Sequence, residues 1–147
     1  MDTELIGRTA DTFRVVIEEG KVREFARATD SHHPDHLREG DPVSPATFLI
    51  SSVLWQDQRS SVMAGIVRDW SRILHGEQEF AFTGPLPRAG DVLTGQQRID
   101  DMFTKEGRRG GTLEFTKIIT EFRDRSGSVV AELTSTMILT AVAPQVE

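Results

Sequence analysis

The sequence predicts an α+β domain in which a curved, mainly antiparallel sheet wraps around one long central helix. After His75 the chain reads as a series of long strands joined by short turns, and short turns connect antiparallel neighbours. Residues 46–56 are apolar nearly all round, which is typical of a buried helix. A sheet with one apolar face must be covered, and this helix is the only adequate cover in the sequence.

The first half of the chain is predicted to contain one strand and two helices. Apolar residues alternate over 12–17, which favours a strand. Residues 21–29 carry apolar side chains at spacings of three and four, the pattern of a short amphipathic helix. His, Pro, Asp and Gly dominate 30–41, so a loop is expected there. A further helical piece is expected within 60–72.

The long central helix has the clearest start in the sequence. Ser44 suits the N-cap position, and Pro45 suits the first helical position, where no amide hydrogen is needed. The apolar run that follows is interrupted only by the small residues Ser51 and Ser52.

The second half is predicted to alternate strands and turns. Phe80 and Phe82 alternate with polar or small residues, which indicates a strand entered after His75. Glycine, proline and charged residues mark the connections. The expected turns are 84–91, 105–111 and 124–127, and the expected strands between and after them are 92–104, 112–123 and 128–140.

Composition and charge limit the kinds of function that the chain can have. The length of 147 residues fits one domain, 1–147, with a real core. The chain has no cysteine, which excludes disulfides and thiolate metal sites, and we expect no cofactor. The start of the chain lacks the pattern of a signal peptide, and no apolar run approaches the roughly 20 residues of a membrane span, so a cytoplasmic protein is expected. The net charge of −6 disfavours nucleic acid or an anionic membrane as a partner.

Short motifs in a defined order give the chain a family resemblance. They are Ile6-Gly7-Arg8, Val22-Arg23-Glu24-Phe25-Ala26-Arg27-Ala28, Pro45-Ala46-Thr47-Phe48, Leu74-His75-Gly76-Glu77-Gln78-Glu79-Phe80, and Pro85-Leu86 with Ala89-Gly90-Asp91. In this order the chain resembles the N-terminal domain of MaoC-like dehydratases, also called the fatty-acid-synthase-type dehydratase region, of the hot-dog superfamily. It resembles in particular the non-catalytic subunits of mycobacterial (3R)-hydroxyacyl-carrier-protein dehydratases, which pair with a catalytic MaoC-like partner.

The resemblance implies a hot-dog fold and chemistry on acyl thioesters. The reaction it implies is the reversible addition or removal of water at C2 and C3 of an acyl chain carried by CoA or acyl carrier protein. Active members use an Asp and a His in a pattern like D-x-N-P-x-H. Backbone amides at the start of the central helix, here Ala46 and Thr47, polarise the thioester carbonyl, because a helix N-terminus offers unpaired N–H groups.

The catalytic pattern is displaced in this chain. Aligning Pro34 and His36 with the pattern puts Ser31 where the Asp belongs, and Asp30 stands one residue too early. General acid–base groups must come within about 3 Å of their proton, so a shift of one residue matters. Asp30 and His36 are therefore the candidate catalytic pair, but the pattern favours a solvated loop in the pseudo-active half of a two-fold dehydratase.

Other residues are candidates for binding. His75, Gly76 and Phe48 are expected to line the substrate site, although His75 also fits a structural histidine bonded to backbone, Gly76 a bulge or close backbone approach, and Phe48 the core. The turn residues Lys105, Arg108 and Arg109 are candidates for holding CoA phosphates or an acidic carrier protein, or are exposed for solubility alone.

A metal site is the weaker interpretation of the histidine-rich loop. His32, His33 and His36 are close in sequence, but Pro34 argues against a helix there, and no cysteine or obvious carboxylate completes a ligand set. We therefore expect no metal.

The leading functional hypothesis is a dehydratase or (R)-specific enoyl hydratase subunit that shapes the acyl channel while a MaoC-like partner supplies Asp and His. One alternative is a self-sufficient homodimeric hydratase or hot-dog thioesterase. Another is a non-catalytic module that binds acyl thioesters. Each implies an acyl-CoA or acyl-carrier-protein ligand and a homo- or heterodimer with another hot-dog subunit.

Overall fold

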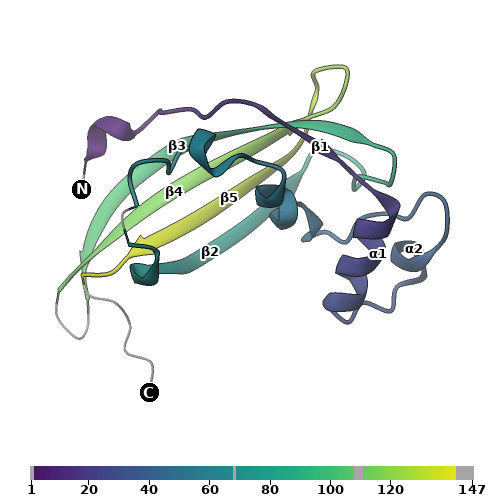
Figure 1. Cartoon of the computed structure of the whole chain (residues 1–147), viewed down its shortest axis with the longest axis horizontal. Coiled ribbons are helices and arrows are strands. Elements are labelled where there is room, and N and C mark those ends of the chain that lie inside the picture. Colours follow the sequence, from purple (N-terminus) through teal and green to yellow (C-terminus); the bar gives the residue numbers. More distant parts are fainter. Residues whose placement is uncertain (1, 68, 108–110, 142–147) are drawn as a thin grey trace.

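A five-stranded antiparallel sheet forms the body of the molecule in the computed structural model, which describes residues 2–67, 69–107 and 111–141 (Figure 1). Its strands lie in the order β1-β3-β4-β5-β2. Their bounds are Phe13–Val16 for β1, Ile73–Phe82 for β2, Val92–Glu106 for β3, Thr112–Arg123 for β4 and Val129–Leu139 for β5. The predicted α+β class with an antiparallel sheet is confirmed.

The strands predicted in the second half of the chain are confirmed, with small shifts at their ends. The strand predicted at 112–123 coincides with β4, whereas β3 continues past the predicted end at 104 to Glu106. β2 begins at Ile73, ahead of the alternation at Phe80 that indicated it. The predicted hairpin closes with the amide of Asp124 donating to the carbonyl oxygen of Ser128 at 3.0 Å.

Apolar side chains on one face of the sheet form two buried clusters. The first gathers residues of β1, β3, β4, β5, α1 (Glu19–Ala28) and η2, the 3₁₀ helix Phe48–Leu54. The second lies farther along the strands. Its members are Ala10, Val62, Met63, Ile99, Met102 and Ile118. The register explains the second cluster, because Ile99 and Ile118 are direct cross-strand neighbours.

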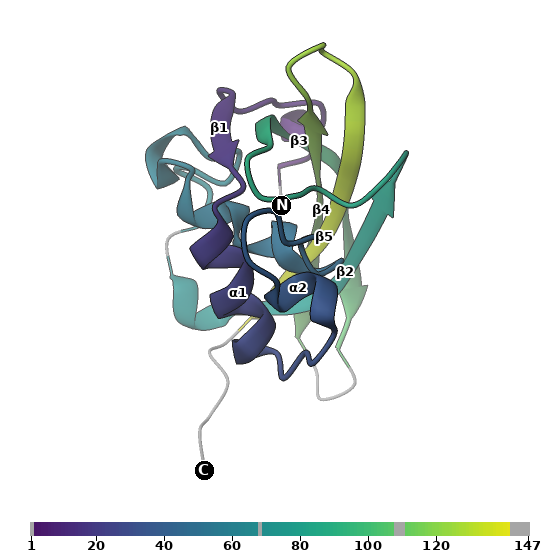
Figure 2. The ribbon, with the colours of Figure 1, turned by 90° about the vertical axis from the view of Figure 1, so that its right-hand side faces the viewer.

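The helix predicted at 21–29 is α1, which lies at one end of the sheet beside the short helix α2, Pro34–Leu37 (Figures 1 and 2). Val22 and Ala26 of α1 are fully buried, as their helical spacing predicts. The expectation of plain loop over 30–41 is wrong, since α2 lies within it. Pro34 takes the first position of α2, where a proline is favourable rather than disruptive.

The long central helix is the main correction. Instead of an α-helix over 46–56, the chain forms the 3₁₀ helix η2, and Val53 and Leu54 are 55% and 82% exposed. The Ser51 hydroxyl donates to the carbonyl oxygen of Phe48 at 2.7 Å. Side-chain bonds of this kind compete with the regular helical ladder, and 3₁₀ runs are short. Only one side of η2 is therefore buried, through Phe48, Leu49 and Ser52.

The predicted helix start at Ser44 is also wrong, whereas the helical piece expected within 60–72 is present as a short 3₁₀ helix. Thr47 is the N-cap of η2, whereas Ser44 is buried and its amide donates to the carbonyl oxygen of Pro87 at 2.8 Å. Turns and the 3₁₀ helix η4, Trp70–Arg72, occupy the described part of 60–72. None of the helices within the described residues has the length and apolar character needed to cross a membrane.

Candidate functional site

The loop that should hold acid–base chemistry keeps its two candidate residues apart. Asp30 has a left-handed backbone with φ 54°, is 92% exposed at its side chain and lies 3.2 Å from the His32 imidazole. His36 is half-buried, and its Nδ1 lies 2.8 Å from the carbonyl oxygen of Val43. Within the described residues, no carboxylate forms an ion pair with His36. The structure does not join Asp30 and His36 into a dyad.

The bond to Val43 determines which ring nitrogen of His36 donates. A carbonyl oxygen only accepts, so Nδ1 carries a proton and donates it in this bond. The ring of His33 lies 5.1 Å away, centroid to centroid, and His33 Nδ1 accepts the amide of Asp35 at 3.3 Å. These bonds order α2 and its flanks.

The histidines do not gather into a metal-binding set. In the part of the chain that the structure describes, no group of three or more His, Cys, Asp or Glu side chains is arranged to hold a metal ion. His32, His33 and His36 instead each contact a neighbour within the loop, Asp30, Asp35 and Val43 respectively.

The backbone donors predicted at Ala46 and Thr47 lie in an exposed turn ahead of η2. The first backbone bond of this turn is donated by Phe48 to the carbonyl oxygen of Pro45 at 2.9 Å. The amides of Ala46 and Thr47 donate to no acceptor among the described residues. Both N–H groups are thus available to an external acceptor.

An apolar cleft of about 680 Å³ lies between the outer end of η2 and the inner face of the sheet. The cleft exists because η2 ends at Leu54. Beyond Leu54 the chain continues in turns and does not cover the strands. Leu54 and Trp70 form part of its wall, and Trp70 is 60% exposed. The lining also includes the apolar or small residues Val53, Met63, Ala64, Gly65, Val67, Ile118 and Met137. Polar and charged residues complete it: Gln56, Gln58, Arg59, Ser61 and Gln97.

Gln97 of β3 connects the wall of this cleft to the sheet through three hydrogen bonds. Its Oε1 accepts from Gln56 Nε2 at 2.9 Å, from the Ser61 hydroxyl at 3.2 Å and from the amide of Val62 at 3.4 Å. Sequence reasoning missed this residue. A polar side chain at an inward position of β3, opposite Thr120, is the signal that was available.

The predicted lining residues are not part of this cleft. Phe48 is 1% exposed and packs in the core against Phe25 and Trp55, with ring centroids 5.5 and 6.4 Å away. His75 is exposed and its Nε2 lies 3.4 Å from Gln78 Oε1, so the expected bond to backbone is wrong. The expectations of a core residue at Phe48 and of a bulge at Gly76 are confirmed. The register shifts between His75 and Glu77, and a Cβ at Gly76 would lie 2.9 Å from Ile138 Cδ1.

Of the three predicted phosphate-binding residues, the structure describes Lys105. Its Nζ lies 5.2 Å from the ring centroids of both Phe103 and Phe115, which stack on the outer face of the sheet. Arg108 and Arg109 lie outside the described residues.

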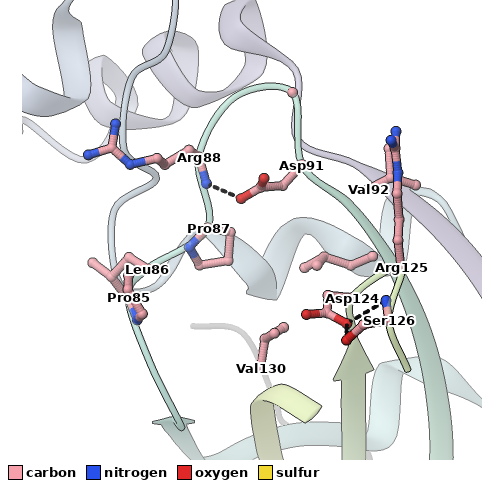
Figure 3. Close-up of a pocket in the computed structure, with 12 residues that line it drawn as sticks. Pro85, Leu86, Pro87, Arg88, Asp91, Val92, Asp124, Arg125, Ser126 and Val130 are labelled. Atoms are coloured by element: carbon pink, nitrogen blue, oxygen red, sulfur yellow. Dashed lines mark hydrogen bonds between the residues drawn. The ribbon is translucent and has the colours of Figure 1, made fainter. Parts of the chain in front are cut away.

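A second, more polar cleft of about 520 Å³ lies between the 85–93 segment and the hairpin at 124–126 (Figure 3). Its charged groups are largely engaged. Arg88 Nη1 lies 2.8 Å from Asp41 Oδ2, and a hydrogen bond from Arg38, aided by the charges of Arg38 and Arg88, lowers the pKa of Asp41. The Ser126 hydroxyl and the amides of Ser126, Gly127 and Ser128 lower the pKa of Asp124. This cleft was not identified from the sequence.

Comparison with known proteins gives consistent results. The family model described as "FAS1-like, dehydratase domain region" matches residues 4–133. A protein named UPF0336 protein from Clavibacter michiganensis subsp. michiganensis is 34% identical over 129 residues, covering 81% of each chain.

Two solved structures are similar in fold. A crystal structure titled as the C-terminally truncated HadBC (3R-hydroxyacyl-ACP dehydratase) complex from Mycobacterium tuberculosis has a TM-score of 0.72 at 24% identity, covering 94% of this chain and 99% of that chain. A structure titled MaoC-like dehydratase has a TM-score of 0.76 at 23% identity, covering 92% of this chain and 42% of that chain. The predicted family resemblance and the hot-dog fold are confirmed.

Proposed function

The chain belongs to the FAS1-like dehydratase domain region family, and from that premise we propose that it is the acyl-binding half of a hot-dog dehydratase or enoyl hydratase. In this proposal the substrate is an acyl chain linked as a thioester to CoA or acyl carrier protein. A second, MaoC-like hot-dog subunit supplies the Asp and His that move the proton and the water.

One observation carries the proposal: an open apolar cleft lies in a chain whose candidate acid–base residues are separated. The cleft volume of about 680 Å³ and its apolar wall suit an alkyl chain, whose burial is favourable in proportion to the apolar area removed from water. Asp30 faces solvent and His36 is bonded to backbone. A subunit that holds the substrate needs a binding surface, and it does not need an assembled Asp–His pair of its own.

The turn ahead of η2 adds a second contribution in this proposal. The amides of Ala46 and Thr47 donate to no described acceptor and are exposed. Preorganised N–H donors of this kind stabilise the oxyanion that develops on a thioester carbonyl when a proton leaves C2. The proposal assigns them to the thioester oxygen.

The test separates binding from turnover. The pure chain is titrated with an enoyl-CoA, and hydration is followed with the chain alone and after addition of a MaoC-like subunit with an intact D-x-N-P-x-H pattern. The proposal predicts binding by the pure chain and turnover only with the partner, above that of the partner alone. Full activity of the pure chain overturns it in favour of a self-sufficient hydratase. Binding without turnover under any partner condition overturns it in favour of a binding module.

A further inference from the structure

Four apolar side chains form a row across the outer face of the sheet, the face opposite the two buried clusters. Leu74 of β2 lies opposite Ile138 of β5. Ile138 in turn lies opposite Phe115 of β4, and Phe115 lies opposite Phe103 of β3. Phe103 follows the buried Met102 along its strand, so the row points away from the core. Leu74 is 42% exposed and the other three are partly exposed, and we call these four residues the apolar row.

The aromatic end of the apolar row is already ordered. Phe103 and Phe115 stack with ring centroids 4.8 Å apart and an interplanar angle of 7°. Lys105 lies on the same face, because its Nζ is 5.2 Å from both ring centroids. Stacked rings present a flat apolar surface, and its burial against a partner is favourable in proportion to the area removed from water.

Opposite charges lie on the two sides of the apolar row along β3. Lys105 follows Phe103 by two residues and Asp101 precedes it by two, so both share its face. Four residues of a strand span about 13 Å, which is too far for Lys105 and Asp101 to pair with each other. Lys117 of β4 lies opposite Asp101, yet neither Asp101 nor Lys105 forms an ion pair within the described residues. Both charges are therefore available to a partner.

The β2 end of the apolar row has the same arrangement. Arg72 and Glu77 lie on the two sides of Leu74 in the sequence. Glu77 is opposite Thr136, on the same side of the row as Asp101. Arg72 Nε lies 2.7 Å from the carbonyl oxygen of Thr140, on the same side as Lys105. At both ends of the row, positive charge is thus on one side and negative charge on the other.

This arrangement of charges is complementary to itself. When two sheets pack face to face about a two-fold axis along the apolar row, each strand lies over its own copy and the two sides of the row exchange. Lys105 of one copy then faces Asp101 of the other, and Arg72 of one copy faces Glu77 of the other. The four apolar residues meet their own copies between these pairs.

The middle of the row adds no opposing charge. About the same axis, Lys117 of one copy faces Leu113 of the other, and Thr136 faces Thr140. A partner with charge of one sign around its contact surface would meet repulsion on one side of the row, whichever sign it carried. A second copy of this chain meets attraction on both sides.

We propose that two copies of this chain pack outer face to outer face over the apolar row, with Lys105 of each copy paired to Asp101 of the other. The surface is separate from the acyl cleft, which lies on the inner face of the sheet. The inference therefore goes beyond the proposed function and does not depend on it.

The test exchanges the two charges. Lys105→Asp opposes two carboxylates across the two-fold axis, and Asp101→Lys opposes two ammonium groups. In analytical ultracentrifugation, each variant should self-associate about tenfold or more weakly than wild type, because like charges meet at the contact. An equimolar mixture of the two variants brings opposite charges together at both contacts and should dimerise at least about tenfold more tightly than either variant alone. Both differences should shrink at high salt.

Matched controls make the same charge changes elsewhere. Lys21→Asp and Asp11→Lys lie at exposed sites away from the apolar row. They should self-associate as tightly as wild type and show no gain on mixing. A wild-type chain that stays monomeric, or a mixture of the Lys105 and Asp101 variants that gains no more than the mixed controls, overturns the inference.

A further variant keeps the test decisive if Asp101→Lys does not fold, since the Asp101 carboxylate accepts the amide of Met102 at 2.8 Å. Phe103→Thr removes one of the stacked rings and keeps a side chain suited to a strand. It should weaken self-association by about tenfold, with circular dichroism confirming the fold. If Phe103→Thr and Lys105→Asp both dimerise as tightly as wild type, the inference is overturned. The enoyl-CoA titration is a separate measurement, so either result leaves the proposed function to its own test.

Discussion

His36 Nδ1, within α2, donates a hydrogen bond of 2.8 Å to the carbonyl oxygen of Val43, which follows α2 in the sequence. The bond closes the loop on itself, and the amide of Val43 in turn donates to the carbonyl oxygen of Asp35 at 2.9 Å. His36 thus holds a short helix in place, and no carboxylate among the described residues forms an ion pair with it. This geometry does not join His36 to Asp30 as the acid–base pattern of the family requires.

The apolar cleft predicts a binding variant that leaves the fold intact. Leu54→Asp places a charge in the wall at a side chain that is 82% exposed in the free chain. Stability should change little, while affinity for an enoyl-CoA should fall by about tenfold or more, because the carboxylate opposes burial of the alkyl chain. Calorimetric titration measures this. Ile6→Asp, at an exposed apolar residue outside the cleft lining, is the control, and an equal loss there contradicts the placement.

The triple acceptor at Gln97 predicts a stability effect. Gln97→Ala leaves the Gln56, Ser61 and Val62 donors without their shared partner, and should lower the free energy of unfolding by about 1–3 kcal/mol. Denaturant unfolding measures the change. The adjacent Gln96→Ala removes one bond to the carbonyl oxygen of Ala10 from an exposed side chain and should cost less than about 1 kcal/mol. Equal losses in the two variants would show that Gln97 has no special role.

A side chain at Gly95 is expected to collide with the Phe13 ring on the inner face of the sheet. A Cβ there would lie 2.5 Å from Phe13 Cζ, and Phe13 packs edge-on against Phe122 at 6.3 Å. Gly95→Ala should therefore displace the Phe13 ring and cost about 1–3 kcal/mol in thermal or denaturant unfolding. Gly84→Ala, where a Cβ meets nothing within 4 Å, is the control. Rescue by Phe13→Leu in the Gly95→Ala background would identify the ring as the cause.

The sheet could be predicted from the sequence because its signals are local. The alternation over 112–123 and the Asp-Arg-Ser-Gly turn at 124–127 each determine a strand or a turn without reference to distant residues. Chain order with short turns then gives the antiparallel neighbours β3, β4 and β5.

The central helix and the cleft could not be predicted in the same way. An apolar run from Phe48 to Trp55 is consistent with a buried helix, but its periodicity does not show whether all of its sides are covered within one chain. In the structure the Ser51 hydroxyl bonds the Phe48 carbonyl, and Leu54 remains exposed. The position of β2 at the edge of the sheet was equally hidden, because a local pattern does not give the strand order.

The bulge at Gly76 could be predicted from its motif. Ala46 and Thr47 lie in a turn, where the sequence predicted the first residues of a helix. Gln97, Met137 and Trp70 meet at the cleft from three distant segments. Such a meeting depends on register and on where η2 ends, and neither is set by a local pattern.

The most direct test of the central claim is the turnover of the reconstituted pair with His36→Asn in this chain. Asparagine keeps an N–H donor near the position of Nδ1 for the Val43 carbonyl and removes the basic Nε2, so the loop stays anchored. Enoyl-CoA hydration by the pair should keep its kcat within about twofold of wild type, because acid–base chemistry comes from the partner subunit. A loss of kcat of about a hundredfold or more, with the complex still assembled, would place His36 in the mechanism and contradict the account.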